Sequence, residues 1–262
     1  MDTEPLKDSN SNRYPPVTGI GRDEHVGMVR EIFATITGRY DFLNHLLSLR
    51  RDVAWRRFTV RKMRFFKTFR LLDVATGTAD LAIEAANGHP GIRVTGVDFI
   101  REMLAVGRQK IAGRGLVDRI RLLQADALKL PFPDGSFDAV GIAFGIRNMP
   151  DRLRALREMR RVLVPGGRIF VLEMNFPRNR LWQGFFDLYL NRFLPAVARL
   201  FSGNPAAYRY LADSILHFPA PQAFLEMMEE AGFRNPERYS LTFGITCLYV
   251  GGKEGPEVRS CA

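Results

Sequence analysis

The chain has 262 residues, of which 46% are hydrophobic and 25% are charged. These values are ordinary for a globular protein with one large domain and argue against a disordered or fibrous chain. The formal net charge of +10 favours anionic partners, such as nucleic acid, acidic substrates or an anionic membrane face. Two cysteines, Cys247 and Cys261, cannot build a disulfide framework, so a reducing, cytoplasmic compartment is predicted.

The ends of the chain and its apolar runs predict neither secretion nor a membrane span. Residues 1–24 are polar and lack an apolar signal core, so we expect a flexible tail there and a frayed end over 254–262. The best apolar run, residues 181–201, is interrupted by charges and a proline. The four histidines have no metal-ligand spacing, and no metal is expected.

Residues 25–69 are predicted to form a helical segment ahead of the main fold. The apolar spacing predicts one helix over 26–38, and residues 40–44 turn into a second, short helix. The stretch 50–70 holds nine Lys or Arg, one acidic residue (Asp52) and aromatic residues at roughly helical spacing. Two interpretations of this basic stretch stay open: contact with an anionic membrane, and a solvated helix face.

From residue 70 onward, short apolar runs alternate with helical stretches. This alternation predicts an α/β fold with a mostly parallel, seven-stranded sheet and helices on both faces. Strands are expected at 70–74, 92–97, 120–124, 137–144, 168–174, 234–241 and 244–250. Helices are expected at 81–87, 102–112, 152–163 and 222–231. Pro165-Gly166-Gly167 is expected to end a helix and turn directly into a strand, and residues 25–253 to form one domain.

Residues 176–218 break the alternation and predict a helical insertion after the fifth strand. The segment is rich in aromatic side chains: Trp182, Phe185, Phe186, Tyr189, Phe193, Phe201, Tyr208 and Tyr210. One interpretation is an apolar lid over a binding pocket. The other interpretation is packing, either within the domain core or at a subunit interface. Packing at a subunit interface would make the protein a homodimer.

The stretch 71–80 has the pattern of a strand and a tight turn into a helix. Small residues at Ala75, Gly77 and Ala79 allow a ligand to approach the backbone, and the helix start offers unpaired N–H groups. Together with Asp73 at the end of the strand, Ala75 and Gly77 are therefore candidates for binding a nucleotide-like cofactor. An ordinary, well-capped strand–turn–helix is the alternative.

Asp98 ends the next predicted strand and sharpens this hypothesis. An acid at that tip is placed to accept hydrogen bonds from both ribose hydroxyls, although it also suits a cap for the helix after Phe99. A dinucleotide prefers a complete Gly-x-Gly-x-x-Gly turn, whereas this turn lacks two of the glycines and carries Asp80. A carboxylate repels a pyrophosphate but suits a sulfonium and an ammonium, so the pattern favours S-adenosylmethionine (AdoMet) over NAD.

Two further segments agree with AdoMet. Gln124-Ala125-Asp126-Ala127 closes the third strand, where the Asp126 side chain can reach an adenine amino group; a solvated loop residue is the alternative. Phe137-Asp138-Ala139-Val140 is typical of AdoMet enzymes.

These segments resemble those of class I AdoMet-dependent methyltransferases, which implies a Rossmann-like fold. More narrowly, the chain resembles the ubiquinone/menaquinone biosynthesis C-methyltransferase family from about residue 29 to residue 253. The resemblance is carried by the following segments: 32–44, 144–151, 158–167, 210–219 and 241–245. The most diagnostic part is Phe144-Gly145-Ile146-Arg147-Asn148.

The resemblance implies AdoMet as cofactor, bound by Thr78, Asp98, Asp126 and Ala127. It implies methylation of a ring carbon on a reduced, prenylated quinone precursor. Gly77-Thr78-Ala79-Asp80 favours demethylmenaquinol over the ubiquinone-pathway counterpart.

The chain also departs from the family pattern at four positions. Ala79 stands where Gly is frequent, and Ala143 where a Ser is sometimes found. Asp52 and Val53 replace a usual His and a usual basic residue. The last two changes put substrate contacts of that segment in doubt.

The implied reaction needs a stabilised phenolate, because ionisation of the hydroxyl makes the neighbouring ring carbon nucleophilic. Arg147, which stays protonated, is the candidate to stabilise the phenolate or to orient a water that removes the ring proton. Asn148 is expected to hold a hydroxyl and Tyr40 to line the ring. The alternative is that Arg147 and Asn148 only brace their loop.

The net charge raises a competing function, methylation of nucleic acid. Such enzymes usually carry an Asn/Asp-Pro-Pro-Tyr/Phe motif after the fourth strand, which this chain lacks, so no nucleic-acid partner is expected. A non-catalytic AdoMet-binding subunit of a lipid-synthesis complex stays open because of Asp52 and Val53. The expected location is the cytoplasm. If the basic stretch 50–70 contacts an anionic membrane, peripheral contact with the inner face of the cell membrane is expected as well.

Overall fold

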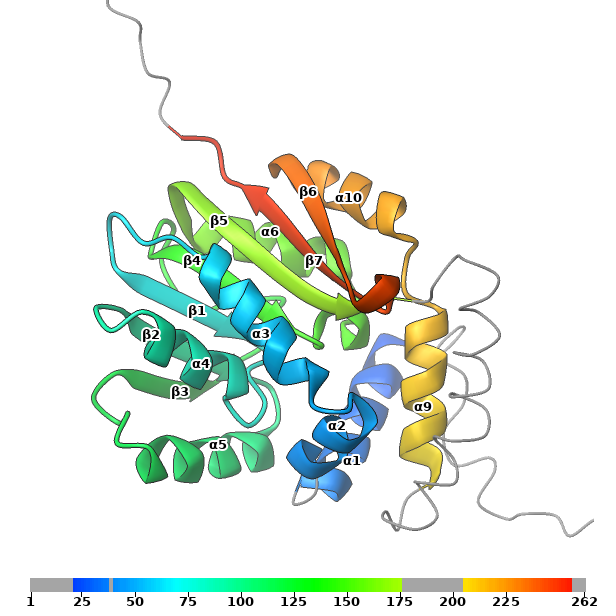
Figure 1. Ribbon diagram of the computed structural model, residues 1–262. Coiled ribbons are helices and arrows are strands. Elements are labelled where there is room, and N and C mark those ends of the chain that lie inside the picture. Colours follow the sequence, from blue (N-terminus) through cyan, green and yellow to red (C-terminus); the bar gives the residue numbers. More distant parts are fainter. Residues whose placement is uncertain (1–20, 38–39, 176–204, 256–262) are drawn as a thin grey trace, which may run out of the picture.

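The computed structural model describes residues 21–37, 40–175 and 205–255, and its centre is a seven-stranded sheet (Figure 1). The strand order is β3-β2-β1-β4-β5-β7-β6. The strands are β1 (Arg70–Val74), β2 (Arg93–Asp98), β3 (Ile120–Gln124), β4 (Phe137–Ala143), β5 (Leu163–Met174), β6 (Arg234–Leu241) and β7 (Thr246–Gly252). Strands β1 to β5 pair in parallel, and β7 is antiparallel to β5 and β6. The order reverses between β1 and β4, where sheets of this kind open a ligand crevice.

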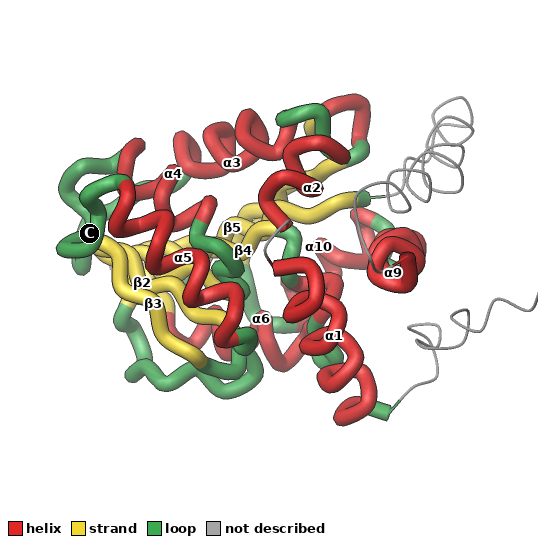
Figure 2. The backbone as a smooth tube through the Cα atoms, turned by 90° about the horizontal axis from the view of Figure 1, so that it is seen from below, coloured by secondary structure: helices red, strands yellow, loops and turns green. Residues whose placement is uncertain are grey.

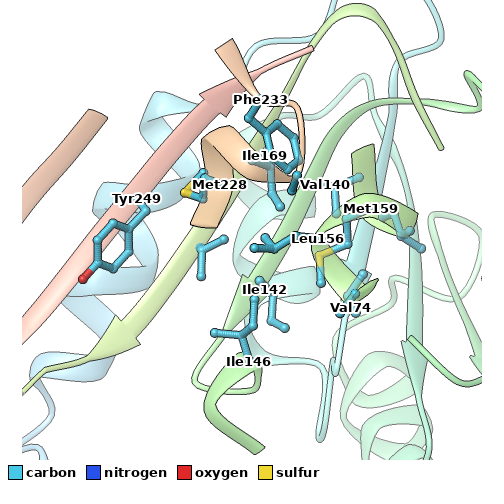
Figure 3. Close-up of a cluster of buried hydrophobic side chains, with 14 of the residues drawn as sticks. Val74, Val140, Ile142, Ile146, Leu156, Met159, Ile169, Met228, Phe233 and Tyr249 are labelled. Atoms are coloured by element: carbon cyan, nitrogen blue, oxygen red, sulfur yellow. The ribbon is translucent and has the colours of Figure 1, made fainter. Parts of the chain in front are cut away.

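Helices cover both faces of the sheet, as the alternation of strands and helices predicts. One face packs against α3 (Arg51–Lys62), α4 (Asp80–Gly88) and α5 (Arg101–Gly113). The other packs against α6 (Arg152–Val162) and α10 (Pro221–Glu230), and Figure 3 shows part of that core. Neighbouring residues Leu71 and Leu72 enter opposite cores, because successive side chains of a strand point to opposite faces.

Three further helices gather at the carboxyl edge of the parallel strands (Figures 1 and 2). They are α1 (Arg22–Ile36), α2 (Tyr40–Leu47) and α9 (Pro205–Leu216). A short 3-10 turn, η2 (Ile146–Asn148), follows β4, and another, η4 (Thr242–Gly244), joins β6 to β7. None of the helices in the described ranges is long and apolar enough to cross a membrane.

The seven-stranded, mostly parallel sheet confirms the predicted fold class, but one expectation is wrong. Pro165-Gly166-Gly167 does not separate a helix from a strand, because β5 already begins at Leu163. The pairing of β5 with β4 slips between Phe137 and Ala139, and Gly166 takes a left-handed φ of 81°. The turn residues therefore form an irregularity inside the strand, where Gly is tolerated.

Several expectations concern segments that lie outside the described residues. These are the N-terminal tail, the frayed C-terminal end and residues 176–204 of the predicted insertion. The described remainder of that insertion contains α9, in agreement with its predicted helical character. The proposed domain limits, residues 25–253, stay a prediction.

Asp138 fixes the chain where it passes from α3 into β1. Its side chain is 1% exposed. The carboxylate accepts backbone N–H hydrogen bonds from Lys67 (3.1 Å), Thr68 (2.9 Å) and Phe69 (2.6 Å). A strand residue thus satisfies the donors of a loop about 70 positions earlier, which explains why an acid is suited to this site.

We expect Asp138→Asn to lower the free energy of unfolding by about 2 kcal/mol, because the amide replaces one acceptor and leaves buried N–H groups unpaired. Chemical denaturation measures this loss. The control is Asp134→Asn, whose 78% exposed side chain pairs with Arg161 at the surface and is expected to cost less than about 1 kcal/mol. Equal stabilities of the two variants would contradict this role for Asp138.

Candidate functional site

A cavity of about 370 Å³ opens at the carboxyl edge of the parallel strands, within the size range of small-molecule sites. Its lining comes from α1, the turns after β1 and β2, the start of α5, the segment after β3 and the loop after β4. The lining residues are Val26, Val29, Phe33, Ala75, Gly77, Val97, Asp98, Phe99, Ile100, Met103, Ala125, Asp126, Ala127, Leu128, Ala143, Phe144, Gly145, Asn148, Met149 and Pro150.

The turn after β1 brings its backbone to the cavity through three left-handed residues. Ala75, Gly77 and Ala79 have φ angles of 51°, 55° and 70°. For an alanine this conformation costs roughly 1 kcal/mol, so the surrounding structure must hold the turn in place. Gly145 allows the loop after β4 to come close, because a Cβ there would lie 2.6 Å from the Cβ of Ala75.

Asp98 holds two turns together at the edge of the cavity. One carboxylate oxygen accepts the N–H of Gly77 at 2.8 Å, and the other accepts the N–H of Ile100 at 2.9 Å. Burial raises the pKa of Asp98, and the hydrogen bonds from Ile100 and Gly77 oppose that rise. Asp98 is not the N-cap of α5, because that position is Ile100 and has no side-chain cap hydrogen bond, so the expected helix-capping role is wrong. The carboxylate lines the cavity, where a ribose is expected.

Asp126 and Ala127 line the cavity on the side of β3. The carboxylate of Asp126 accepts the N–H of Leu128 at 2.8 Å, which fixes the turn that follows the strand. The predicted cofactor residues Ala75, Gly77, Asp98, Asp126 and Ala127 therefore meet at one cavity.

Two other predicted cofactor residues, Asp73 and Thr78, are not part of the cavity lining. Asp73 lies beneath the turn and accepts hydrogen bonds from the Thr76 hydroxyl (2.6 Å) and the N–H of Ala82 (3.1 Å). Burial raises the pKa of Asp73 to about 7. The Thr78 hydroxyl donates to Asp41 at 2.5 Å. Both side chains shape the turn, and their direct contact with a cofactor stays a prediction.

Lys110 was not expected from the sequence, yet it connects the turn to α2. Its ammonium group lies 2.6 Å from the Asp41 carboxylate and 2.5 Å from the Asp80 carboxylate. Asp80 also faces Arg56 at 3.6 Å and does not line the cavity. Two cations of this chain therefore surround the Asp80 carboxylate, and its place beside a bound sulfonium stays a prediction.

Asp52, which departs from the family pattern, has a structural role in the α2–α3 region. It is 3% exposed and accepts hydrogen bonds from Ser48 (2.6 Å) and Arg56 (2.5 Å). Burial alone raises the pKa of Asp52, but the Ser48 hydrogen bond and the Arg56 charge outweigh it and hold the pKa below its usual value. The residue stabilises the helix pair and does not line the cavity.

Arg147, the predicted phenolate-stabilising residue, is buried behind the cavity wall. Its guanidinium donates to Glu173 at 2.5 Å and to the Phe144 carbonyl at 2.7 Å, and its own N–H donates to Glu173 at 3.2 Å. Glu173 is 0% exposed, so the pair is a buried ion pair at the end of β5. This geometry favours the interpretation that Arg147 braces its loop.

Asn148 is the predicted catalytic residue that the structure does place at the cavity. Its Oδ1 accepts a hydrogen bond from the Tyr210 hydroxyl of α9 at 3.1 Å. Tyr210 falls in a family-like segment, but nothing in the local sequence pairs it with a residue 62 positions earlier. Tyr40 begins α2, and its side chain lies outside the described part of the structure.

The comparisons with known proteins place the chain in a family. The model of the ubiE/COQ5 methyltransferase family matches residues 20–253. The chain belongs to this family. It is therefore a methyltransferase, and AdoMet is its cofactor. Among the described residues, no group of His, Cys, Asp or Glu could hold a metal ion.

Curated relatives are similar over almost their whole length. The demethylmenaquinone methyltransferase of Thermus thermophilus is 48% identical over 223 residues, covering 85% of this chain and 100% of that protein. The protein of the same description from Deinococcus radiodurans is 47% identical and covers 86% and 92%. The ubiquinone/menaquinone biosynthesis C-methyltransferase of Geotalea daltonii is 45% identical and covers 86% and 96%.

Solved structures agree on the fold. A putative methyltransferase from Haloferax volcanii, in complex with its Trm112 activator, has a TM-score of 0.60 at 17% identity, covering 86% of this chain and 97% of that chain. A methyltransferase from Thermotoga maritima has a TM-score of 0.58 at 18% identity, with 86% and 99% covered. At such identities the likeness extends to the fold alone.

We expect Asp98→Ala to raise the Kd for AdoMet by about 30- to 100-fold, because it removes a buried charged acceptor and releases the turn at Gly77. Calorimetric titration measures the Kd, and thermal melting checks that the variant folds. Asp118→Ala, an exposed acid outside the cavity, is the matched control. A folded Asp98→Ala variant that binds AdoMet normally would rule out this role.

Proposed function

We propose that this methyltransferase transfers the AdoMet methyl group to a ring carbon of a reduced, prenylated quinone precursor, with demethylmenaquinol as the favoured substrate. The observation that carries the proposal is the 45–48% identity to relatives named for quinone methylation. The gathering of Asp98, Asp126 and Asn148 at one cavity supports it.

The cavity lining suits two different ligands side by side. Asp98, Asp126 and the Gly77 backbone offer polar groups for the adenosyl part of the cofactor. Val29, Phe33 and Met149 supply an apolar wall against which an aromatic ring can pack. We therefore assign the polar side to the cofactor and the apolar side to the quinol.

The protein's task in this reaction is alignment and the exclusion of water. AdoMet, when bound, supplies an electrophilic methyl group. A ring carbon of the hydroquinone would take this methyl group, the electron pair of the carbon–sulfur bond would go to sulfur, and the ring proton would be released to water. Asn148 lines the cavity and is proposed to hydrogen-bond the ring oxygen, because such a bond favours the ionised form of the hydroxyl. Arg147, held by Glu173, fixes the loop that presents Asn148, and Tyr40 is proposed to line the ring.

The direct test is turnover. The purified protein, incubated with AdoMet and reduced demethylmenaquinone, is expected to give a product heavier by one methylene, detected by mass spectrometry. The oxidised quinone should give no product, because its ring carbon is not activated by a phenolate. AdoMet binding without methylation of this quinol or its ubiquinone-pathway counterpart would overturn the proposal and favour a non-catalytic AdoMet-binding subunit.

We also propose peripheral contact with an anionic membrane through residues 50–70. Eight of the nine basic side chains there are exposed, and Arg56 alone among the nine is buried. Phe66 and Phe69 are 54% and 52% exposed within the same stretch. Cations beside apolar side chains suit the surface of an anionic bilayer.

A homodimer stays a separate prediction, which sedimentation velocity would test.

The membrane proposal predicts that the protein floats with phosphatidylglycerol-containing vesicles at low salt. Arg64→Glu combined with Lys67→Glu should abolish this binding, because repulsion replaces attraction in the stretch. Arg108→Glu combined with Arg114→Glu changes the net charge equally on exposed positions of α5 and its end, and should bind better than the first variant. Failure of the wild-type protein to float at low salt would exclude the proposal.

A further inference from the structure

Tyr210 connects α9 to the wall of the cavity. Its side chain is 6% exposed, and its hydroxyl lies 3.1 Å from Oδ1 of Asn148. Asn148 lines the cavity and ends the turn that Arg147 and Glu173 brace. One side chain of a distant helix therefore contacts the polar residue that faces the proposed quinol.

The environment of Tyr210 keeps its hydroxyl protonated. Burial raises the pKa of Tyr210, and the charges of Arg147 and Arg152 only partly oppose this rise. A protonated phenol can donate to an amide oxygen, and Oδ1 is the acceptor end of the Asn148 side chain. This hydrogen bond orients the amide, with its carbonyl oxygen toward α9.

We propose that Tyr210 is a positioning residue for methyl transfer, which orients Asn148 so that the amide NH₂ serves as a donor to the ring oxygen of the quinol. This inference rests on the proposed function. An amide NH₂ carries two protons, so it can donate to a ligand while it also bonds to the protein.

The direction of the amide matters for the reaction. A donor stabilises a phenolate oxygen more than a neutral hydroxyl, whereas a carbonyl oxygen facing the same atom repels the developing negative charge. With the NH₂ group toward the ring oxygen, the bound quinol ionises at lower pH. Loss of the Tyr210 hydroxyl removes one of the interactions that orient the amide, so the correct orientation is populated less often.

The test is Tyr210→Phe, which removes one hydroxyl and keeps the ring that packs in the wall. We expect kcat to fall roughly tenfold. This loss is smaller than the roughly 10²- to 10³-fold loss of kcat on removal of a direct oxyanion donor, because Asn148 itself remains. The acid limb of the kcat–pH profile should move to higher pH, while the Kd for AdoMet stays within about twofold. Tyr239→Phe is the matched control, because the Tyr239 hydroxyl donates to the exposed side chain of Glu237 and neither residue lines the cavity.

A double-mutant cycle with Asn148→Ala separates positioning from general stability. If Tyr210 acts through Asn148, Tyr210→Phe should lower kcat little further in the Asn148→Ala background. An equal loss in both backgrounds, or an unchanged kcat and pH profile in the single variant, would overturn the inference. A wild-type protein that fails to methylate the quinol would instead overturn the proposed function on which the inference rests.

Discussion

The ammonium group of Lys110 joins three helices next to the cavity. It extends from α5 and pairs with Asp80 at the start of α4 and Asp41 on α2. These side chains are between 18% and 27% exposed, so solvent screens their attraction less than on an open surface. Because Asp41 also accepts from Thr78, α2 is tied directly to the cofactor turn. The helix α2 thus docks beside the turn after β1 through ion pairing and hydrogen bonding.

Different kinds of interaction stabilise the two sides of the cavity. On the cofactor side, backbone conformation dominates, since left-handed Ala75 and Gly77 are held by neighbouring strands and by the Asp98 carboxylate. On the side proposed for the substrate, side-chain pairs such as Tyr210–Asn148 and Arg147–Glu173 connect segments that are far apart in sequence. Substitutions on the second side can therefore alter substrate handling while the cofactor turn keeps its shape.

Much of the sheet could be predicted from sequence because apolar periodicity is a local signal. The predicted limits of β1, β3 and β6 coincide with those in the structure. The start of β5 could not be predicted, because Pro165-Gly166-Gly167 has the composition of a turn and only pairing with β4 shows that the strand includes it. Local patterns carry no information on such partners.

The same limit explains which of the predicted cofactor residues line the cavity. Ala75, Gly77, Asp98, Asp126 and Ala127 lie at strand ends, and strand ends of a parallel sheet meet at one edge. The direction of a side chain cannot be predicted in the same way. Asp80 occupies the predicted turn, but its carboxylate pairs with Lys110 and Arg56. Lys110 and Tyr210 were not predicted, because each contacts a partner on another element.

The diagnostic segment from Phe144 to Asn148 shows how a recognisable motif relates to chemistry. Its conspicuous charge, Arg147, is turned away from the cavity and bound by Glu173 and by the Phe144 carbonyl. Phe144 itself has a left-handed φ of 60°, and Gly145 fits where a Cβ would collide with Ala75. A buried ion pair needs both members, since either charge alone is costly in the interior. The motif therefore specifies the path of a loop more than a set of reacting groups. Its consequence for the reaction is the placement of Asn148, Met149 and Pro150 at the cavity, where the ring of the substrate is proposed to lie.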